Sequence, residues 1–277
     1  MRIGLVQLSS GPDPKENLPK TVQLIQAAFD AGAELVATPE VTNLVTSDRA
    51  IQNAHIRAAD QDETLTALRA LAAKNRRWIL IGSLAVQSEK SAGRFVNRSF
   101  LIDARGEITA HYDKIHMFDV TLPNGEVYRE SRNYVAGQRA ICADTPFCKI
   151  GLSICYDLRF PYLYRDLAQA GAKVIFVPSA FAVPTGAAHW HSLLRARAIE
   201  TGAYIVAPAQ TGTHGSGATA RKTYGHSLVV SPWGDVLLDA GQQTGHFICE
   251  LNLMKVDEMR AQIPSLQGDP DYELING

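Results

Sequence analysis

The sequence predicts an α/β fold in a single domain that spans residues 1–277. Short apolar runs typical of buried strands alternate with segments whose apolar residues recur every three or four positions, as on one face of a helix. No internal repeat, low-complexity tract or linker interrupts this alternation. The chain is also 46% hydrophobic, which is enough for one large core. A layered α/β architecture is therefore the simplest interpretation.

The first half of the chain alternates strand and helix signals from its first residues. The segments predicted there are, in order, a strand over 2–8, a helix that closes at Gly32, a strand over 34–38, a helix about 65–72, a strand over 78–86 and a hairpin that joins 97–103 to 107–112. Pro39 ends the second strand, and Ala104-Arg105-Gly106 is a turn signal at the hairpin.

The second half opens with an irregular stretch over 120–140. It carries several charges and the turn signal Pro123-Asn124-Gly125, so we expect a long functional loop. The segments predicted after it are a strand over 147–154, a helix over 161–170, a strand over 173–177, a helix over 187–201, a strand over 204–207, a hairpin that joins 224–230 to 236–239 and a last strand over 246–251.

Charge and cysteine usage exclude several classes of protein. The chain has 27 Lys and Arg against 28 Asp and Glu, a net charge of −1 without a basic run, so we expect no nucleic-acid partner. The first apolar run is too short for a signal peptide, and no segment reaches the roughly 18 apolar residues of a membrane span. The four cysteines contain no Cys-x-x-Cys pair, and we expect a cytoplasmic protein with reduced thiols.

Three reactive side chains each follow an apolar strand signal. Glu40 comes after 34–38, Lys114 after 107–112, and Cys155 at the end of 149–154. In α/β proteins the ends of strands present side chains to a crevice, so three chemical types in this position suggest one site. Taken singly, Glu40 could be a helix N-terminal acid and Lys114 an exposed cation.

Cys155 lies where a predicted strand meets a predicted helix. Such a turn exposes its side chain and directs backbone N–H groups toward it, as in the elbow that presents a nucleophilic serine. The alternative is a buried structural thiol, which is the common role of a lone cysteine. Structural roles are the better interpretation for the other three cysteines, which are Cys142, Cys148 and Cys249.

Histidines leave two further alternatives. A thiol nucleophile often has a histidine partner, and the candidates are His116, His189, His191, His214 and His226. No family signature of a Cys–His protease surrounds them. His189 and His191 are two positions apart and do not share a helix face, so we expect no metal there.

At these residues the chain resembles the carbon–nitrogen hydrolase (nitrilase) superfamily over nearly its whole length. The motif regions that carry the resemblance are Thr38-Pro39-Glu40-Val41, Tyr112-Asp113-Lys114-Ile115-His116-Met117-Phe118-Asp119 and Ser153-Ile154-Cys155-Tyr156-Asp157-Leu158-Arg159-Phe160. Later segments, among them Pro178-Ser179-Ala180-Phe181, resemble the Nit branch of ω-amidases and deaminated-glutathione amidases. The resemblance implies a four-layer α–β–β–α sandwich.

The resemblance also implies a site and a mechanism. The family's Glu–Lys–Cys triad falls on Glu40, Lys114 and Cys155, and a second active-site glutamate falls on Glu130 in its Glu-Ser context. The thiolate would attack an amide carbon, with Glu40 as the base and Lys114 as an oxyanion donor. The other expected contacts with oxyanion or substrate are the Tyr156 N–H, the Arg159 guanidinium and Phe181. The alternative for Arg159 is a structural pair with an acid such as Asp157. No cofactor is needed.

The expected substrate is a small amide that carries a carboxylate, and the expected product is ammonia. True nitrilases commonly carry Cys-Trp-Glu, whereas Cys155-Tyr156-Asp157 favours an amide over a nitrile. The rival functions are an N-carbamoyl amino acid amidohydrolase, a nitrilase and a catalytically silent interaction module. The family implies a homodimer or a higher even-numbered oligomer, and we expect the apolar residues of 160–170 to contribute to its interface.

Overall fold

Two mixed sheets form the centre of the molecule in the computed structural model, which describes residues 1–122, 125–217, 220–268 and 273–275. The strand order of the first sheet is β16 (Gly245–Glu250), β1 (Arg2–Gln7), β2 (Leu35–Ala37), β3 (Trp78–Gln87), β4 (Phe95–Ile102) and β5 (Ile108–Asp113). The order of the second is β15 (Val236–Asp239), β14 (Leu228–Val230), β11 (Tyr204–Ala207), β10 (Val174–Phe176), β9 (Lys149–Leu152) and β8 (Ile141–Asp144).

The two sheets are built alike, with parallel strands at the centre and antiparallel strands outside. β2 pairs in parallel with β1 and β3, and β10 pairs in parallel with β9 and β11. Every residue of β2 and of β10 is buried, because a layer covers each face of the sheet. The uninterrupted apolar runs of these strands follow from that burial.

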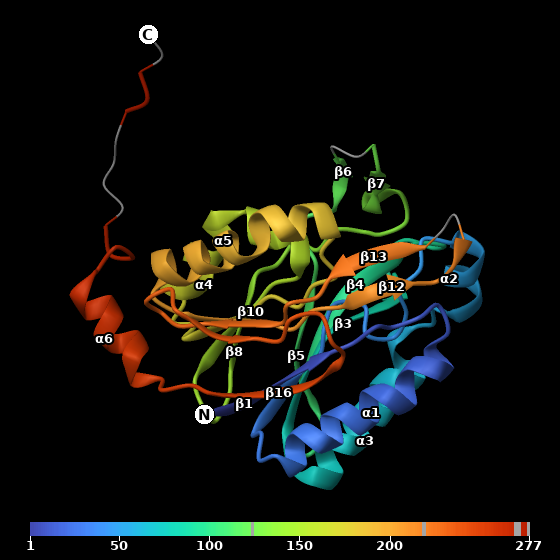
Figure 1. The fold of residues 1–277 in the computed structure, drawn as a ribbon, viewed down its shortest axis with the longest axis horizontal. Helices are drawn as coiled ribbons and strands as arrows, with labels where there is room; N and C mark the ends of the chain where they lie inside the picture. Colours follow the sequence, from blue (N-terminus) through green and yellow to red (C-terminus); the bar gives the residue numbers. More distant parts are fainter. Residues whose placement is uncertain (123–124, 218–219, 269–272, 276–277) are drawn as a thin grey trace.

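Helices cover the outer face of each sheet. Figure 1 shows α1 (Pro14–Asp30) and α3 (Glu63–Asn75) together on one side of the molecule, and α4 (Pro161–Gln169) and α5 (Val183–Thr201) on the other. One apolar cluster joins α1 and α3 to the first sheet, and a larger one includes inward-facing residues of both sheets and the buried side of α4 and α5. The predicted four-layer sandwich is confirmed.

Local chemistry sets the limits of α1. The Asp13 side chain accepts a hydrogen bond from the Lys15 N–H at 2.9 Å, and Pro14 occupies the first helical position, where no N–H is needed. Gly32 follows the helix with φ 91°, a conformation that costs glycine little, and turns the chain toward β2.

The structure departs from the predicted elements in several places. The expected loop over 120–140 contains a small sheet of β6 (Asp119–Thr121) and β7 (Val127–Arg129), although Pro123 and Asn124 lie outside the described residues. The predicted strand over 224–230 is interrupted by Gly225 and His226, both with positive φ. The described elements that were not predicted include α2 (Arg49–His55), η1 (Ala59–Gln61), β8, the pair β12 (Thr211–His214) and β13 (Arg221–Tyr224), and α6 (Met254–Gln262).

Within the described part of the chain, no helix combines the length and the apolar character that crossing a membrane requires. The C-terminal helix α6 lies at the end of the sandwich away from β12 and β13 (Figure 1). The small sheet of β12 and β13 lies on the opposite side of the molecule from α6 in this view (Figure 1). That side carries the candidate site.

Candidate active site

Side chains that follow strands of both sheets meet in one cavity of about 410 Å³. Glu40 lies three residues beyond β2, Lys114 directly follows β5, and Cys155 lies three residues beyond β9. Glu130 reaches the same cavity from the short 3₁₀ helix η2 (Glu130–Arg132). The structure thus brings together the four residues for which the sequence predicts catalytic roles.

Glu40 is buried and fully hydrogen-bonded. Its Oε1 accepts hydrogen bonds from Lys114 Nζ at 3.0 Å and from Asn97 Nδ2 at 2.8 Å, and its Oε2 accepts one from the Ala180 N–H at 2.8 Å. Burial favours a raised pKa for this carboxyl, but the cations of Lys114 and Arg221 outweigh it, so the pKa of Glu40 lies below its usual value. Glu40 is therefore an ionised hydrogen-bond acceptor at neutral pH.

Lys114 is a buried cation held between two carboxylates. Its Nζ lies 3.0 Å from Glu40 Oε1 and 3.0 and 2.8 Å from the two oxygens of Glu130. Burial favours a lowered pKa for this amine, but Glu130 and Glu40 together raise the pKa of Lys114 well above its ordinary value. Glu130 also accepts a hydrogen bond from the Phe118 N–H at 2.7 Å, which fixes its position. Lys114 thus stays charged and its ammonium is held in place.

Cys155 begins the 3₁₀ helix η3 (Cys155–Arg159) with φ 50°, in the left-handed region that a non-glycine residue rarely adopts. Its N–H donates to the Pro178 carbonyl at 3.0 Å, which anchors this sharp turn to the segment after β10. The next N–H, that of Tyr156, is at the start of η3, where backbone donors have no acceptor within the helix. The elbow predicted from the sequence is therefore present.

The Asp157 carboxylate fixes the turn at Cys155 through hydrogen bonds. Its carboxylate is fully buried and accepts hydrogen bonds from the Ile154 N–H at 2.8 Å, the Tyr112 hydroxyl at 2.7 Å and the His116 N–H at 3.0 Å. Two of these donors lie on or just after β5, in the first sheet, and Asp157 follows β9, in the second. Asp157 therefore ties the turn that carries Cys155 to the segment that carries Lys114.

The environment of the Cys155 thiol favours its neutral form. Burial and the neighbouring Glu40 carboxylate raise the pKa of Cys155 far above its ordinary value, although Lys114 acts in the opposite direction. A protonated thiol beside an ionised carboxylate is the starting state for general-base activation of a nucleophile.

The three residues with expected substrate or oxyanion contacts have different positions. Tyr156 and Phe181 line the cavity. Arg159 is not among the described residues that line it; Arg159 Nη2 lies 3.1 Å from His189 Nδ1, and its guanidinium lies 5.7 Å from the centre of the Phe181 ring. The partner of Arg159 is thus His189 rather than Asp157, and its expected contact with substrate has no support in the cavity.

The lining residues that were not predicted from the sequence include Arg221 and Asn97. Arg221 on β13 donates through Nη2 to the Ala180 carbonyl, and its guanidinium lies 5.6 Å from the centre of the Tyr128 ring. Asn97 on β4 binds Glu40, as described above. A lone arginine beside Lys222 and an asparagine in an apolar strand give no sequence signal of a site.

The histidines do not support a Cys–His pair. None of the cavity's described lining residues is a histidine. His116, the nearest to Lys114 in sequence, places its Nδ1 2.7 Å from Asp157 and stacks on Phe160 with ring centres 3.5 Å apart. The contacts of His116 are thus with residues at and just after the turn that carries Cys155.

Known proteins share both the sequence pattern and the fold. The profile of the carbon–nitrogen hydrolase family matches residues 2–261. The deaminated glutathione amidase of Synechocystis sp. is 41% identical over 264 residues, which are 95% of each chain. The crystal structure of the Caenorhabditis elegans NitFhit protein superposes with a TM-score of 0.87 at 36% identity and covers 95% of this chain and 63% of the longer NitFhit chain.

A third relative has been studied at its nucleophile. A mutant of the amidase from Nesterenkonia sp. AN1 is 27% identical with a TM-score of 0.77, over 95% of this chain and 98% of that one. Its structure records Michael addition of acrylamide at the active-site cysteine. Family profile, whole-length relatives and fold agree with one another. The chain belongs to the carbon–nitrogen hydrolase family, within the nitrilase superfamily.

Proposed function

We propose that this protein is a deaminated-glutathione amidase-like enzyme that hydrolyses a small, carboxylate-bearing amide and releases ammonia through a thioester on Cys155. The observation that carries the proposal is the position of Lys114, whose Nζ binds Glu40 and Glu130 in the cavity that Cys155 lines. The 41% identity to a deaminated glutathione amidase supports this substrate class.

In the proposed first half-reaction, the Cys155 sulfur attacks the amide carbon while Glu40 takes the thiol proton. The negative charge on the former carbonyl oxygen is stabilised by Lys114 Nζ and the Tyr156 N–H; loss of one such donor costs about 3–4 kcal/mol of barrier in known enzymes. Glu40 then passes its proton to the amide nitrogen as the C–N bond breaks, which leaves ammonia and a thioester.

In the second half-reaction, Glu40 takes a proton from water as the water oxygen attacks the thioester carbon. Collapse of that intermediate breaks the C–S bond, and the proton returns to the sulfur of Cys155. The products are a carboxylic acid and the free enzyme, so no redox step or bound cofactor is involved. Glu130 contributes by holding the Lys114 ammonium through both half-reactions.

We propose that Arg221, rather than Arg159, binds the carboxylate of the substrate. Arg221 lines the cavity with Cys155, and no ion pair joins it to any acidic residue in the described ranges. A guanidinium binds a carboxylate through two parallel N–H donors, which makes it suited to this role. Arg221→Gln should raise KM for a carboxylate-bearing amide and spare propionamide. Arg159→Gln is the matched control, and equal losses on both substrates in Arg221→Gln would contradict the role.

The test of the function is ammonia release across deaminated glutathione, ω-amides of dicarboxylic acids, N-carbamoyl amino acids and nitriles, with Cys155→Ala as the blank. We expect the fastest turnover with a carboxylate-bearing amide. Release of CO₂ with ammonia from a carbamoyl compound would indicate the N-carbamoyl amidohydrolase instead. A nitrile as the best substrate would overturn the substrate class, and absence of turnover on the whole panel would favour the silent interaction module.

We also propose a single domain, a cytoplasmic location and an even-numbered oligomer for this protein. One domain over 1–277 is supported by the apolar cluster that includes residues of both sheets. A cytoplasmic location is supported by the four cysteines, all of which are free thiols, as in a reducing compartment. A homodimer or higher even-numbered oligomer would use Tyr162, which is 60% exposed, rather than Leu163, Tyr164 and Leu167, which are buried in the protein's own core. Light scattering at micromolar concentration tests it, and a monomer would contradict it.

A further inference from the structure

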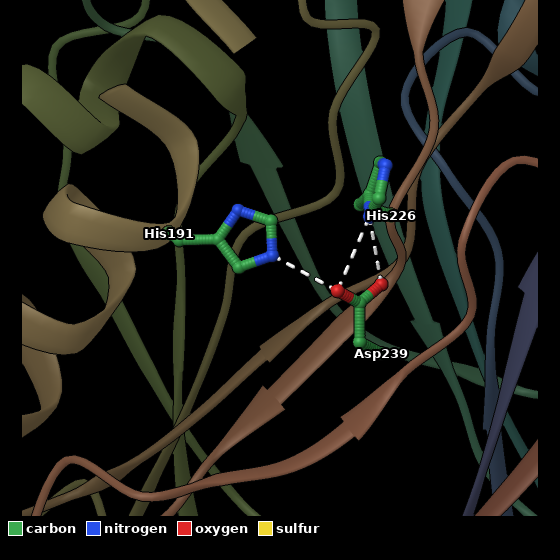
Figure 2. Close-up of side chains that lie close together, drawn as sticks. All are labelled: His191, His226 and Asp239. Carbon is green, nitrogen blue, oxygen red and sulfur yellow. Dashed lines mark hydrogen bonds and ion pairs between the residues drawn. The ribbon is translucent and has the colours of Figure 1, made fainter. Parts of the chain in front are cut away.

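A group of two histidines and one aspartate lies outside the catalytic cavity, and the proposed reaction does not use it. His191 is on α5, His226 is in the link between β13 and β14, and Asp239 ends β15. Figure 2 shows both imidazole rings directed at the Asp239 carboxylate from different parts of the chain. In the described ranges, this is the one group of at least three His, Cys, Asp or Glu side chains with metal-binding spacing.

We propose that His191, His226 and Asp239 form a binding site for a divalent zinc-type transition-metal ion. Two imidazole nitrogens and one carboxylate oxygen are a set of three protein ligands that leaves a fourth position for water. The ligand atoms come from three separate elements, so a bound ion would join α5 to the β13–β14 link and to β15.

Each histidine nitrogen lies slightly closer to the Asp239 carboxylate than two ligands of one such ion would. His191 Nε2 lies 2.9 Å from Asp239 Oδ2, and His226 Nδ1 lies 2.9 and 3.2 Å from the two Asp239 oxygens; all three ligand atoms lie within 4.8 Å of one another. Tetrahedral ligands at ordinary zinc distances are about 3.3–3.4 Å apart. Each His–Asp239 distance would therefore lengthen by up to about half an ångström around the ion, and the two imidazole nitrogens, now within 4.8 Å of each other, would turn toward it. Any proton now shared with Asp239 would pass to the other ring nitrogen or to solvent.

The ligands combine fixed positions with access to solvent. The His226 backbone adopts φ 56°. Two hydrogen bonds hold it there: the His226 N–H donates to the Gly241 carbonyl, and the Trp190 Nε1–H donates to the His226 carbonyl at 2.8 Å. The Asp239 side chain is 34% exposed and that of His191 36%, so an ion can reach them.

The proposed site is connected to the wall of the catalytic cavity. Trp190, which binds the His226 carbonyl, packs against Phe181 with ring centres 4.9 Å apart, and Phe181 lines the cavity. Tyr224 stacks on His226 at 4.4 Å and donates its N–H to the Phe181 carbonyl at 2.9 Å. An ion at this site would therefore brace β13 and the wall behind Phe181, without contact with substrate.

The test is a Co²⁺ titration of the full chain carrying Cys155→Ala, which removes the active-site thiol as a competing ligand. Optical absorption reports the ligands, because Co²⁺ held by nitrogen and oxygen gives d–d bands without the thiolate charge-transfer band that a cysteine ligand adds. We expect one Co²⁺ per chain, no thiolate band and a higher midpoint of thermal unfolding. His191→Asn and Asp239→Asn should each weaken Co²⁺ binding by at least about tenfold.

The matched control is His189→Asn, which removes a neighbouring histidine of the same helix and should leave Co²⁺ binding unchanged. Thermal unfolding without metal checks that each variant is folded, and His191→Asn, a partly exposed helix position, carries the test if Asp239→Asn does not fold. Absence of saturable Co²⁺ binding would overturn the proposal, and the cluster would then be a hydrogen-bonded brace alone. Equal binding by His191→Asn and the parent chain, or a thiolate band, would place the ion elsewhere and also overturn it.

Discussion

Lys114→Met tests the charge arrangement of the site, because methionine keeps most of the side-chain volume and removes the cation. The Lys114 side chain is 2% exposed, and its removal leaves the carboxylates of Glu40 and Glu130 facing each other at 6% and 15% exposure. Removing one partner of a buried ion pair typically costs about 3–5 kcal/mol, because the remaining charge is buried without compensation. We expect a loss of that size in the free energy of unfolding at pH 8.

The pH dependence of the loss identifies its cause. In the parent protein the pKa of Glu40 is below its usual value, so the stability this group contributes is complete above its unfolded pKa and is lost only as pH falls through the lower folded pKa. Without Lys114, burial and Glu130 should instead raise the pKa of Glu40. The variant should therefore recover stability as pH falls from 8 to 5, whereas the Glu40 contribution to the parent protein stays nearly constant over this range.

Urea unfolding at pH 8 and pH 5 measures both effects. Lys173→Met is the matched control: Lys173 Nζ lies 2.6 Å from Asp257 in a solvent-exposed pair, and such pairs contribute about 0–1 kcal/mol. The reasoning would be refuted if Lys114→Met lost less than about 1 kcal/mol of the free energy of unfolding, as an exposed pair does, and kept the pH dependence of the parent protein.

Three further predictions concern the base, the elbow and the packing. Because the pKa of Glu40 lies below its usual value, the acid limb of the kcat/KM profile should fall below the ordinary glutamate range, and a limb near neutral pH would argue against Glu40 as the base. Asp157→Asn should lower kcat at least about tenfold at near-constant KM, because the Asp157 carboxylate positions the turn that carries Cys155. An unchanged kcat in steady-state kinetics would contradict this positioning role. Gly82→Ala should destabilise the fold by about 1–3 kcal/mol or more in urea unfolding, because a Cβ there would lie 2.0 Å from the Thr38 carbonyl oxygen, whereas Gly11→Ala, with 3.7 Å to its nearest neighbour, should not.

The sequence predicted elements well where hydrophobic periodicity was strong. The buried run at Leu35–Ala37 and the helix α1, which begins at an aspartate cap, follow from local chemistry. Periodicity failed for β12 and β13, because Thr211–His214 and Arg221–Tyr224 pair mainly with each other and bury few of their residues. Tertiary pairing, rather than propensity, makes those segments strands.

Local sequence signals likewise predicted some residues of the site and missed others. Glu40, Lys114 and Cys155 follow strands and lie in family motifs, so their meeting in one cavity could be predicted. Arg221 could not, because its place in the cavity depends on how β13 folds back beside Phe181, a contact about 40 residues away in the chain. For the same reason the helix spacing of His191 gave no sign of His226 or Asp239, which only the folded chain brings beside it.

The thioester on Cys155 is the central claim, and it can be measured directly. Brief reaction of the protein with a carboxylate-bearing amide, acid quenching and mass spectrometry of the digested chain should find the acyl group on the peptide that contains Cys155, with ammonia released in step with acylation. Cys155→Ala should show neither the adduct nor turnover. Turnover by Cys155→Ala within tenfold of the parent protein, or an acyl group on a different residue, would contradict the account.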